Sequence, residues 1–467
     1  MQVIVDLAAR VERLDERLRR LEQQLRQDSR TSSKPPSSDP PQTRRQRRAA
    51  ARAKAKELVR GERKAGGQPG HRGSGRQLEP EDQVDEIVDH DPDACRGCGL
   101  GFAADERRPS GRFGRHQVAE LPPISVIVVE HRTHRLRCPA CRVQTTAALP
   151  AQLGGSAFAI NLQAAVVTLT ARERISRRGI VELARDLFGV SLSTGAVDAI
   201  GQRARDALAG PHTQPHDWLL DQAALHIDET GWRTAGESRA LWTLTNPEAA
   251  IFQIAEDCDR EQLSALIGSY PGIIVSDRWP GYEHLDPAAR QACWSHLQRD
   301  FRRHAEGLAE QKTFGEPGLK LTSRVFKAWR AYQHDRDRQR LQAEIDEISS
   351  QLRPLVEHAT RTSPRTRHHR RFANNPLKIW PALWTFAALD GVQPTNNPAE
   401  RALRGPVIHR KLSHGTRSLE GERFAERVPS AAATCRPQRR SLFSYLRELL
   451  NAHNRGDPFP ELTRAAA

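Results

Sequence analysis

Three acidic residues of this 467-residue chain stand where strand ends and a helix would bring them to one site. Asp228 and Asp277 each close a short apolar run, and Glu400 falls on a helix predicted further along the chain. One acid at the end of each of two strands, with a third on a later helix, can hold two divalent metals about 3.5–4 Å apart for in-line attack on a phosphodiester. The chain carries 57 acidic residues, so chance would also place a few at strand ends. Whether these three form a metal site therefore depends on the elements around them.

The elements predicted around these acids follow a recognisable order. The predicted elements are strands at 225–228, 240–245, 249–254 and 273–276, a helix at 260–267, and a fifth strand at 291–294 that leads into a helix. An Asn246-Pro247 turn separates the second and third strands. Three strands, a helix and a strand, with acids on the first and fourth strands, is the order of a ribonuclease-H-like core. An α/β fold of this kind is therefore expected.

Three blocks of sequence resemble the signature blocks of bacterial transposases of the insertion-sequence-66 family. They read HIDETGW at 226–232, CWSHLQRDF at 293–301 and NNPAER at 396–401. Residues 31–38, 66–71 and 407–418 also resemble this family, so the likeness covers nearly the whole chain. The resemblance implies a DDE triad of Asp228, Asp277 and Glu400, a helical insertion before Glu400, and a need for helper proteins encoded by the element.

Four residues near the triad are candidates for supporting or rival roles. Cys293-x-x-His296 resembles the Cys/Asp-x-x-His element of several DDE transposase groups, although a structural histidine beneath the site is equally compatible with it. Arg401 and Arg404 follow Glu400, and Arg404, one turn on, shares its helix face and could hold a scissile phosphate. Glu229 is the rival metal ligand, but as the neighbour of Asp228 on a strand it should face the other way.

Four of the seven cysteines form two pairs, Cys95-x-x-Cys98 and Cys138-x-x-Cys141. Four thiolates on two tight turns give a closed tetrahedral zinc site with a structural role. The gap between the pairs is longer than the usual ribbon spacing, and we expect strands within 117–131 to fill it. Four unliganded cysteines are the alternative. The isolated residues Cys258, Cys293 and Cys435 are expected to be buried small residues and not ligands.

The N-terminal segment carries an apolar seam followed by a basic arm. The seam residues are Ile4, Leu7, Val11, Leu14, Leu18, Leu21 and Leu25. Their alternating three and four spacing predicts a short coiled coil, with a helix packed inside one subunit as the alternative. Residues 44–64 hold ten Lys or Arg against two Glu, a local net charge of +8. The candidate phosphate contacts of this arm are Arg44, Arg45, Arg47, Arg48, Lys54 and Lys56.

Residues 181–197 match a helix-turn-helix pattern. Helix 181–187 is followed by a turn containing Gly189, and Ser193 and Thr194 open a second, capped helix. DNA reading by Ser193 and Thr194 is the functional interpretation, and a helical hairpin that binds nothing is the alternative. Near the C-terminus, Pro429 falls where an uninterrupted helix is expected, and a proline inside a helix costs about 3 kcal/mol.

Composition agrees with a polyanionic partner, because 72 basic residues against 57 acidic ones give a net charge of +15. No run of about 18 apolar residues exists, and a cytoplasmic, nucleoid-associated protein is expected. The expected domains are a coiled coil at 1–28, a basic linker and arm at 29–75, a zinc-binding module at 76–150, a helix-turn-helix region at 151–215, the first part of the core at 216–303, a helical insertion at 304–391, the second part of the core at 392–425 and a C-terminal helical region at 426–467.

The sequence thus favours a DDE transposase that cleaves DNA and transfers strands with two Mg²⁺ ions, Mn²⁺ being a possible substitute. Its partners would be the terminal repeats of the element, target DNA and further copies of the chain. One alternative is a DNA-binding protein with an inactive core that marks element ends. The other is a ribonuclease-H-like nuclease that cuts without joining.

Overall fold

The computed structural model describes residues 77–103, 114–122, 124–150, 155–361 and 367–463, together with residue 153 and isolated positions before residue 50, although the side chains of 367–369 and 371 are excepted. The chain forms two units, residues 41–125 and residues 1–40 with 126–467. Among the described residues, every helix is too short or too polar to cross a bilayer.

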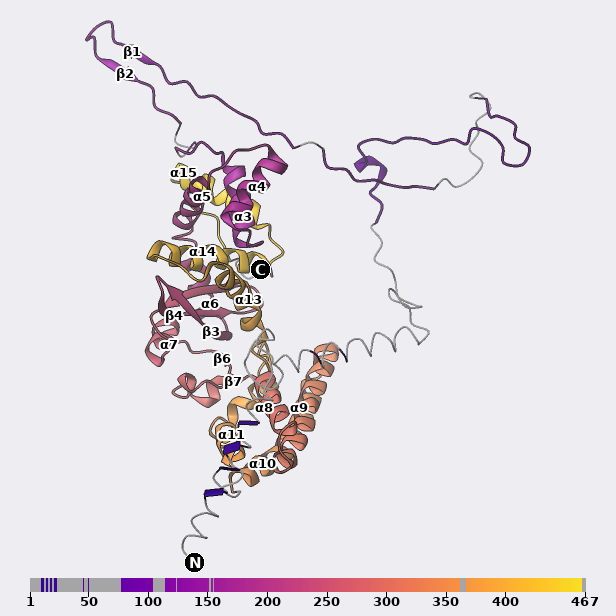
Figure 1. The fold of residues 1–467 in the computed structure, drawn as a ribbon, viewed down its shortest axis with the longest axis vertical. Helices are drawn as coiled ribbons and strands as arrows, with labels where there is room; N and C mark the ends of the chain where they lie inside the picture. The colour runs from indigo at the N-terminus through magenta and orange to yellow at the C-terminus, as the bar shows by residue number, and fades with distance from the viewer. Residues whose placement is uncertain are drawn as a thin grey trace, which may run out of the picture. The chain divides into compact units, whose positions relative to one another are not determined.

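A five-stranded mixed sheet forms the centre of the larger unit (Figure 1). Its strands are β3 (Ala224–Thr234), β4 (Glu237–Thr245), β5 (Ala250–Ala255), β6 (Ile273–Ser276) and β7 (Arg290–Ala292). The order is β5-β4-β3-β6-β7. Strands β3, β4 and β5 are antiparallel neighbours, whereas β6 runs parallel to β3 and β7 runs parallel to β6. The expected mixed α/β class is confirmed.

Two tight turns fix the register of the antiparallel strands. Ala235 and Gly236 join β3 to β4, and both have positive φ angles of 53° and 92°, as a two-residue type I′ hairpin loop requires. Between β4 and β5, the Asn246 side chain accepts the backbone N–H groups of Glu248 and Ala249, each at 2.9 Å. The predicted Asn246-Pro247 turn is thus confirmed, with the asparagine side chain closing it.

Helices cover both faces of the sheet. On one face, α7 (Arg260–Ile267) buries Leu263, Leu266 and Ile267 against the sheet, with Asp259 capping its first turn. On the other face, α13 (Asn397–Ser413) packs on β3 and α14 (Leu419–Cys435) packs on β5. Helix α14 continues through Pro429, so the proline does not interrupt this helix.

Strand β5 is an edge strand whose outward N–H groups are bonded by α14. The backbone N–H groups of Ala250, Phe252 and Ile254 donate to Thr434 Oγ1, Ser430 Oγ and Glu426 Oε1, at 3.2, 2.9 and 2.7 Å. Four residues of helix rise about 6 Å, and two residues of strand rise about 6.6 Å. Because these repeats nearly match, every fourth residue of α14 meets every second residue of β5.

A helical layer lies against α14 on the side away from the sheet (Figure 1). It consists of α3 (Ile160–Ala171), α4 (Arg177–Phe188), α5 (Thr194–Ala207) and α15 (Leu442–Arg455), and α6 (Thr213–Leu220) leads from it to β3. The predicted helix-turn-helix elements are present as α4 and α5. Gly189 adopts a left-handed φ of 64° after α4, and Ser193 Oγ accepts the Ala196 N–H at 3.0 Å to cap α5.

The segment between β7 and α13 is helical. It contains α8 (Trp294–Ala305), α9 (Ala309–Asp335), α10 (Arg338–Thr360), α11 (Arg367–Lys378) and the short α12 (Thr385–Ala388). Helix α10 buries Leu341, Ile345, Ile348 and Leu352, which recur every three or four residues, in a cluster shared with α9. The predicted fifth strand is shorter than expected, because Trp294 already begins α8.

Each cysteine pair lies in a local turn, the first pair in the unit of residues 41–125 and the second in the larger unit. Around the second pair, β1 (Arg135–Arg137) and β2 (Gln144–Thr146) form an antiparallel hairpin. The expected strands within 117–131 are wrong, because no described residue of that range is in a strand. The isoleucines and valines of residues 124–129 are 47–91% exposed. Their β propensity therefore meets no packed surface that would stabilise a strand.

Most of the predicted coiled coil and basic arm lies outside the described residues. Of the seam, Val11, Leu14, Leu18 and Leu21 are described as helical, and they are 50–59% exposed. Of the arm, Arg45 is described as helical, whereas Arg44, Arg47, Arg48, Lys54 and Lys56 lie outside the described part.

Candidate active site

The two candidate aspartates occupy equivalent places on neighbouring parallel strands. His226 of β3 pairs with Val275 of β6, and each aspartate follows two residues later, Asp228 within β3 and Asp277 directly after β6. Parallel strands lie about 4.8 Å apart, so the register sets these carboxylates side by side. Strand β3 does not end at Asp228 as the sequence suggested; it continues to Thr234, because Trp232 is buried and the hairpin to β4 extends it.

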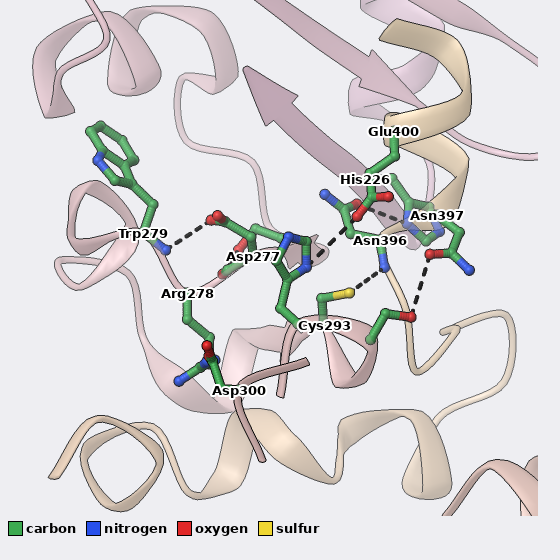
Figure 2. A network of polar contacts seen from close by, with 12 residues as sticks. His226, Asp277, Arg278, Trp279, Cys293, Asp300, Asn396, Asn397 and Glu400 are labelled. Carbon is green, nitrogen blue, oxygen red and sulfur yellow. Dashed lines mark hydrogen bonds and ion pairs between the residues drawn. The ribbon is translucent and has the colours of Figure 1, made fainter. Parts of the chain in front are cut away.

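The third acid is carried to the same place by the first turn of α13. Glu400 follows Asn396, a buried asparagine before this helix. Asn396 Nδ2 donates to the Ile227 carbonyl at 2.7 Å, its Oδ1 lies 3.3 Å from His226 Nδ1, and its backbone N–H donates to Cys293 Sγ at 3.1 Å (Figure 2). One residue therefore connects the start of α13 to β3 through its side chain and to the start of α8 through its backbone N–H.

The acids share one electrostatic environment. The pKa of Asp228 is raised to about 8, first by burial and then by the negative charges of Glu229, Asp277 and Glu400. A carboxyl group resists ionisation when other carboxylates lie close to it and water is scarce. Asp277 is oriented by the Trp279 N–H, which donates to its Oδ1 at 2.8 Å. The three predicted triad residues are thus brought together in the folded chain.

Glu229 is close to the acids but is directed to the opposite face of β3. Its Oε2 accepts a hydrogen bond from the hydroxyl of the fully buried Tyr282 at 2.7 Å. Burial, and then the charge of Asp277, raise the pKa of Glu229 to about 7. Thr230, on the Asp228 face, accepts instead from Arg410 of α13 at 3.2 Å. The alternation of side chains along β3 therefore follows the sequence-based expectation.

We expect Glu229→Gln to lower metal-dependent DNA cleavage far less than Asp228→Asn, because the amide of the first variant would keep an acceptor for Tyr282 while Asp228 stays on the site face. The paired measurement is the initial rate of cleavage for the two purified variants at the same Mg²⁺ concentration. Equal loss in both would place Glu229 among the ligands. Tyr282→Phe, which removes the hydroxyl facing Glu229, is the control for damage on the other face of the strand.

Comparison with known proteins identifies a family from the part of the chain that contains the candidate active site. The sequence profile of the Transposase IS66 family matches residues 155–423, which is more than half of the 467 residues. The chain belongs to this family. A second profile, described as Family of unknown function (DUF6444), matches residues 1–77.

One relative is the protein named Uncharacterized protein y4hP of Sinorhizobium fredii (strain NBRC 101917 / NGR234). It is 27% identical over 282 residues, which cover 53% of this chain and 51% of the relative. The alignment thus spans about half of that protein. The family predicted from the signature blocks is confirmed.

Three potential metal-donor atoms of this IS66-family chain lie beside the acids. Those of Cys293, His296 and Glu400 are all within 4.8 Å of one another, and His296 Nδ1 is 3.7 Å from Glu400 Oε1. Burial raises the pKa of Cys293 to about 11, so its thiol stays neutral and accepts the Asn396 N–H. Cys293 is buried, as expected. A neutral thiol is a poor metal ligand, which leaves His296 and Glu400 as the usable donors.

The buried Nδ1 of His296 forms no hydrogen bond with any described residue. Burial and the charge of Arg299 lower its pKa, whereas Asp277 and Glu400 act in the opposite direction. The carboxylates of Asp277 and Glu400 therefore lie near the imidazole ring of His296, the residue with the predicted supporting role. Arg401 and Arg404 are exposed on α13 and line a cavity beside this helix.

Sequence reasoning missed two arginines that support the acids. Arg290 of β7 is 1% exposed, and its Nη2 lies 3.4 Å from the Asp277 carbonyl and 3.2 Å from Ser276 Oγ. Arg278 forms an ion pair with Asp300 of α8 and donates to Asn375 Oδ1 at 2.9 Å. Neither stands in a motif with a recognisable spacing. Only the strand and helix contacts reveal that they fix the loop around Asp277.

The two cysteine pairs have the same backbone geometry. In each, the first cysteine N–H donates to the carbonyl five residues on, Cys95 to Leu100 at 2.8 Å and Cys138 to Val143 at 2.9 Å. In each, the residue four positions on has a positive φ, 76° at Gly99 and 60° at Arg142. Backbone N–H groups of the following residues lower the pKa of Cys95 and of Cys138. Both turns thus favour the thiolate, which is the form that binds metal.

The isolated cysteines differ. Cys435 is buried as predicted, but Cys258 is exposed, so the expectation that it would be buried is wrong. It lies in the turn after β5, where its thiol bonds to Glu229.

Ser193 and Thr194 lie at the start of α5, whose sides pack against α3, α4, α14 and α15.

Proposed function

We propose that this chain is a DDE transposase that cleaves element ends and joins them to target DNA. The observation that carries the proposal is that β3, the end of β6 and the start of α13 bring Asp228, Asp277 and Glu400 together, so that Asp277 and Glu400 add, after burial and Glu229, to the raised pKa of Asp228. Divalent cations bound between carboxylates offset both the burial of the negative charge and the repulsion between the acids. Asp228, Asp277 and Glu400 would hold two Mg²⁺ ions, with Mn²⁺ as an alternative.

The core that carries these residues is proposed to be ribonuclease-H-like. The order β5-β4-β3-β6-β7, with β6 and β7 parallel to β3 and the first three strands antiparallel, supports this. Acids on β3, after β6 and on a helix packed against β3 agree with it. The helical segment α8 to α12 would be the insertion, and the domain boundaries expected from the sequence remain proposals.

The chain's own residues orient the acids for the reaction. When bound, the metals would stabilise the charge that develops on the phosphate and activate first water and then the freed 3′-hydroxyl. The Trp279 N–H holds one oxygen of Asp277, and Asn396 holds the start of the Glu400 helix on β3. His296, 3.7 Å from Glu400 Oε1, would limit the positions that this carboxylate can adopt.

A strand-transfer assay tests the proposal. The full chain is incubated with Mg²⁺, labelled DNA that carries the sequences flanking its own gene, and a plasmid target. Nicked ends and joined products are both expected. Nicks without joined products would favour a nuclease that does not join. End-specific binding without nicks would favour an inactive end-binding protein.

We also propose that Cys95, Cys98, Cys138 and Cys141 hold one structural zinc. The matching turns and the lowered pKa of Cys95 and Cys138 support this, since a closed four-thiolate set suits zinc and leaves no open position for chemistry. The basic arm, Ser193 and Thr194 at the start of α5, and the N-terminal seam remain proposed contacts for DNA and for a second copy. A need for element-encoded helper proteins and association with the nucleoid are proposed with them.

The zinc proposal predicts about one tightly bound zinc per purified chain, because four thiolates saturate one tetrahedral ion. Cys95→Ser and Cys138→Ser are each expected to lose the metal and to weaken binding to specific ends more than cleavage of a short pre-nicked substrate. Elemental analysis and end-binding titrations check both points. Cys258→Ser, at an exposed cysteine outside the pairs, is the matched control. Folded, end-specific protein without zinc would contradict the prediction.

A further inference from the structure

A cavity of about 700 Å³ lies along α13, the helix that carries Glu400, between the sheet, α14 and the α3–α4 loop. Five arginines line it: Arg172 and Arg174 from the loop, Arg401 and Arg404 from α13, and Arg436 after α14. No Asp or Glu of the described residues lines it. Within the described part of the chain, none of these guanidinium groups forms an ion pair or a hydrogen bond, so their charges are uncompensated there.

Arg174 is held in this cavity by an unusual backbone. Its φ is 59°, a left-handed conformation that costs a non-glycine residue of order 1 kcal/mol or more and that concentrates at functional sites. Gly405 of α13 faces it, and a Cβ at Gly405 would lie 3.4 Å from Arg174 Nη2. A Cβ at this distance would make an ordinary van der Waals contact with the guanidinium. The Arg174 side chain therefore lies directly against α13 at Gly405 and places a positive charge there.

The rest of the wall is apolar. Phe424, Pro429 and Ala432 of α14 line it, as does Ile408 of α13. Phe424 is only partly buried, so one aromatic ring is accessible from the cavity. Arginines that face an aromatic and aliphatic wall match a ligand with both phosphate and a flat ring. A nucleotide has this chemistry.

The size of the cavity selects among forms of nucleic acid. A volume near 700 Å³ is in the range of small-ligand pockets, and a duplex is too wide to enter it. Arg404 and Ile408 follow Glu400 by four and eight residues, which is about 6 and 12 Å along the helix axis. At about 3.4 Å per nucleotide along one strand, this corresponds to about two to four nucleotides from Glu400.

We propose that this cavity binds one unpaired nucleotide of the DNA strand, about two to four positions from the phosphate at Glu400. The arginines would hold its flanking phosphates and Phe424 would stack on its base. The inference rests on the proposed function and adds a preference for DNA that is already unpaired beside the cleavage position. A mispaired base is displaced from the stack more readily than a paired one.

The test compares two duplexes of equal length that carry a nick, one fully paired and one with a single mispaired thymine three positions from the nick. Binding is measured by fluorescence anisotropy with the full chain, in chelator, so that no cleavage occurs. We expect the native chain to bind the mispaired duplex about tenfold more tightly, since stacking one base on an aromatic ring accounts for such a factor.

Two variants separate charge from shape. Arg174→Gln removes a charge and keeps a polar side chain, whereas Gly405→Leu adds a side chain that narrows the cavity beside Arg174 without changing charge. Both variants are expected to bring the ratio of the two affinities close to one. Arg260→Ala removes the charge of an exposed arginine on α7, on the other face of the sheet, and should leave the ratio unchanged. Circular dichroism establishes that each variant is folded.

Each outcome decides between the proposals. A native chain that binds both duplexes with equal affinity would overturn the cavity's role while leaving the transposase proposal intact. Preference for the mispaired duplex that persists in both Arg174→Gln and Gly405→Leu would also overturn it. Failure of the native chain to bind either duplex would instead contradict the proposed function.

Discussion

Asp228→Asn, Asp277→Asn and Glu400→Gln are each expected to reduce Mg²⁺-dependent cleavage by about 10³-fold or more, because metal ions supply several kcal/mol of stabilisation to a phosphoryl transition state. Each amide keeps the shape of the acid and loses the charge that binds metal. Single-turnover cleavage of a labelled element end, with and without Mn²⁺, measures the loss. Binding of the same DNA in chelator should change little, since the acids are not proposed to contact DNA without metal.

Glu261→Gln is the matched control for Glu400→Gln. Both residues are acids in the first turn of a helix, α7 for Glu261 and α13 for Glu400, so the same substitution is made at the same kind of position. Cleavage by the Glu261 variant should be normal. A triad variant that cleaves at the native rate would remove its residue from the metal site.

The metal-free protein is expected to lose stability as the pH rises from about 5 to 8. The folded chain raises the pKa of Asp228 from 3.8 to about 8, so in this range the folded state binds more protons than the unfolded state. Stability falls with pH wherever the folded state binds more protons. Asp228→Asn should therefore raise the free energy of unfolding at pH 8 in chelator, on the order of 2–4 kcal/mol, and with it the melting temperature. The same variant should flatten the dependence of stability on pH.

Thermal unfolding at several pH values, in chelator and then with Mg²⁺, checks this. Mg²⁺ should restore much of the lost stability in the native chain at pH 8 and much less in the Asn variant, because a bound cation offsets the charge of the buried carboxylate and its repulsion by the neighbouring acids. Part of the pH slope should remain in Asp228→Asn, since burial and Asp277 also raise the pKa of Glu229 to about 7. An Asn variant that melts at or below the native temperature would contradict the prediction.

Local patterns predicted the elements that carry the acids well. The helix expected at 260–267 has those bounds in the structure, and β6 ends one residue before Asp277. These succeed because turn residues and a cap mark their ends, Asp259 for α7 and Pro271-Gly272 before β6. The end of β3 was placed too early at Asp228, because the partner strand β4 extends it through the hairpin and no local signal marks that extension.

The features that failed depend on contacts between distant residues. The β-branched run at 124–129 forms no strand among its described residues, since propensity alone does not supply a pairing partner. Asn396 was recognised only as part of a motif, yet it bonds to Ile227, 169 residues away. Arg174 meets Gly405 across an even longer separation. Periodicity carries no information about such pairs, so the polar connections of the site and its neighbouring cavity required the folded structure.

The bonds between β5 and α14 decide where the chain can be shortened. The family profile ends at residue 423, before Glu426, Ser430 and Thr434, which accept the outward N–H groups of β5. A chain ending at 423 would present an unsatisfied strand edge to solvent, and such edges recruit strands from other molecules. Aggregation of that shortened protein would then reflect intermolecular β pairing. A catalytic fragment intended for crystallisation should accordingly extend at least through α14.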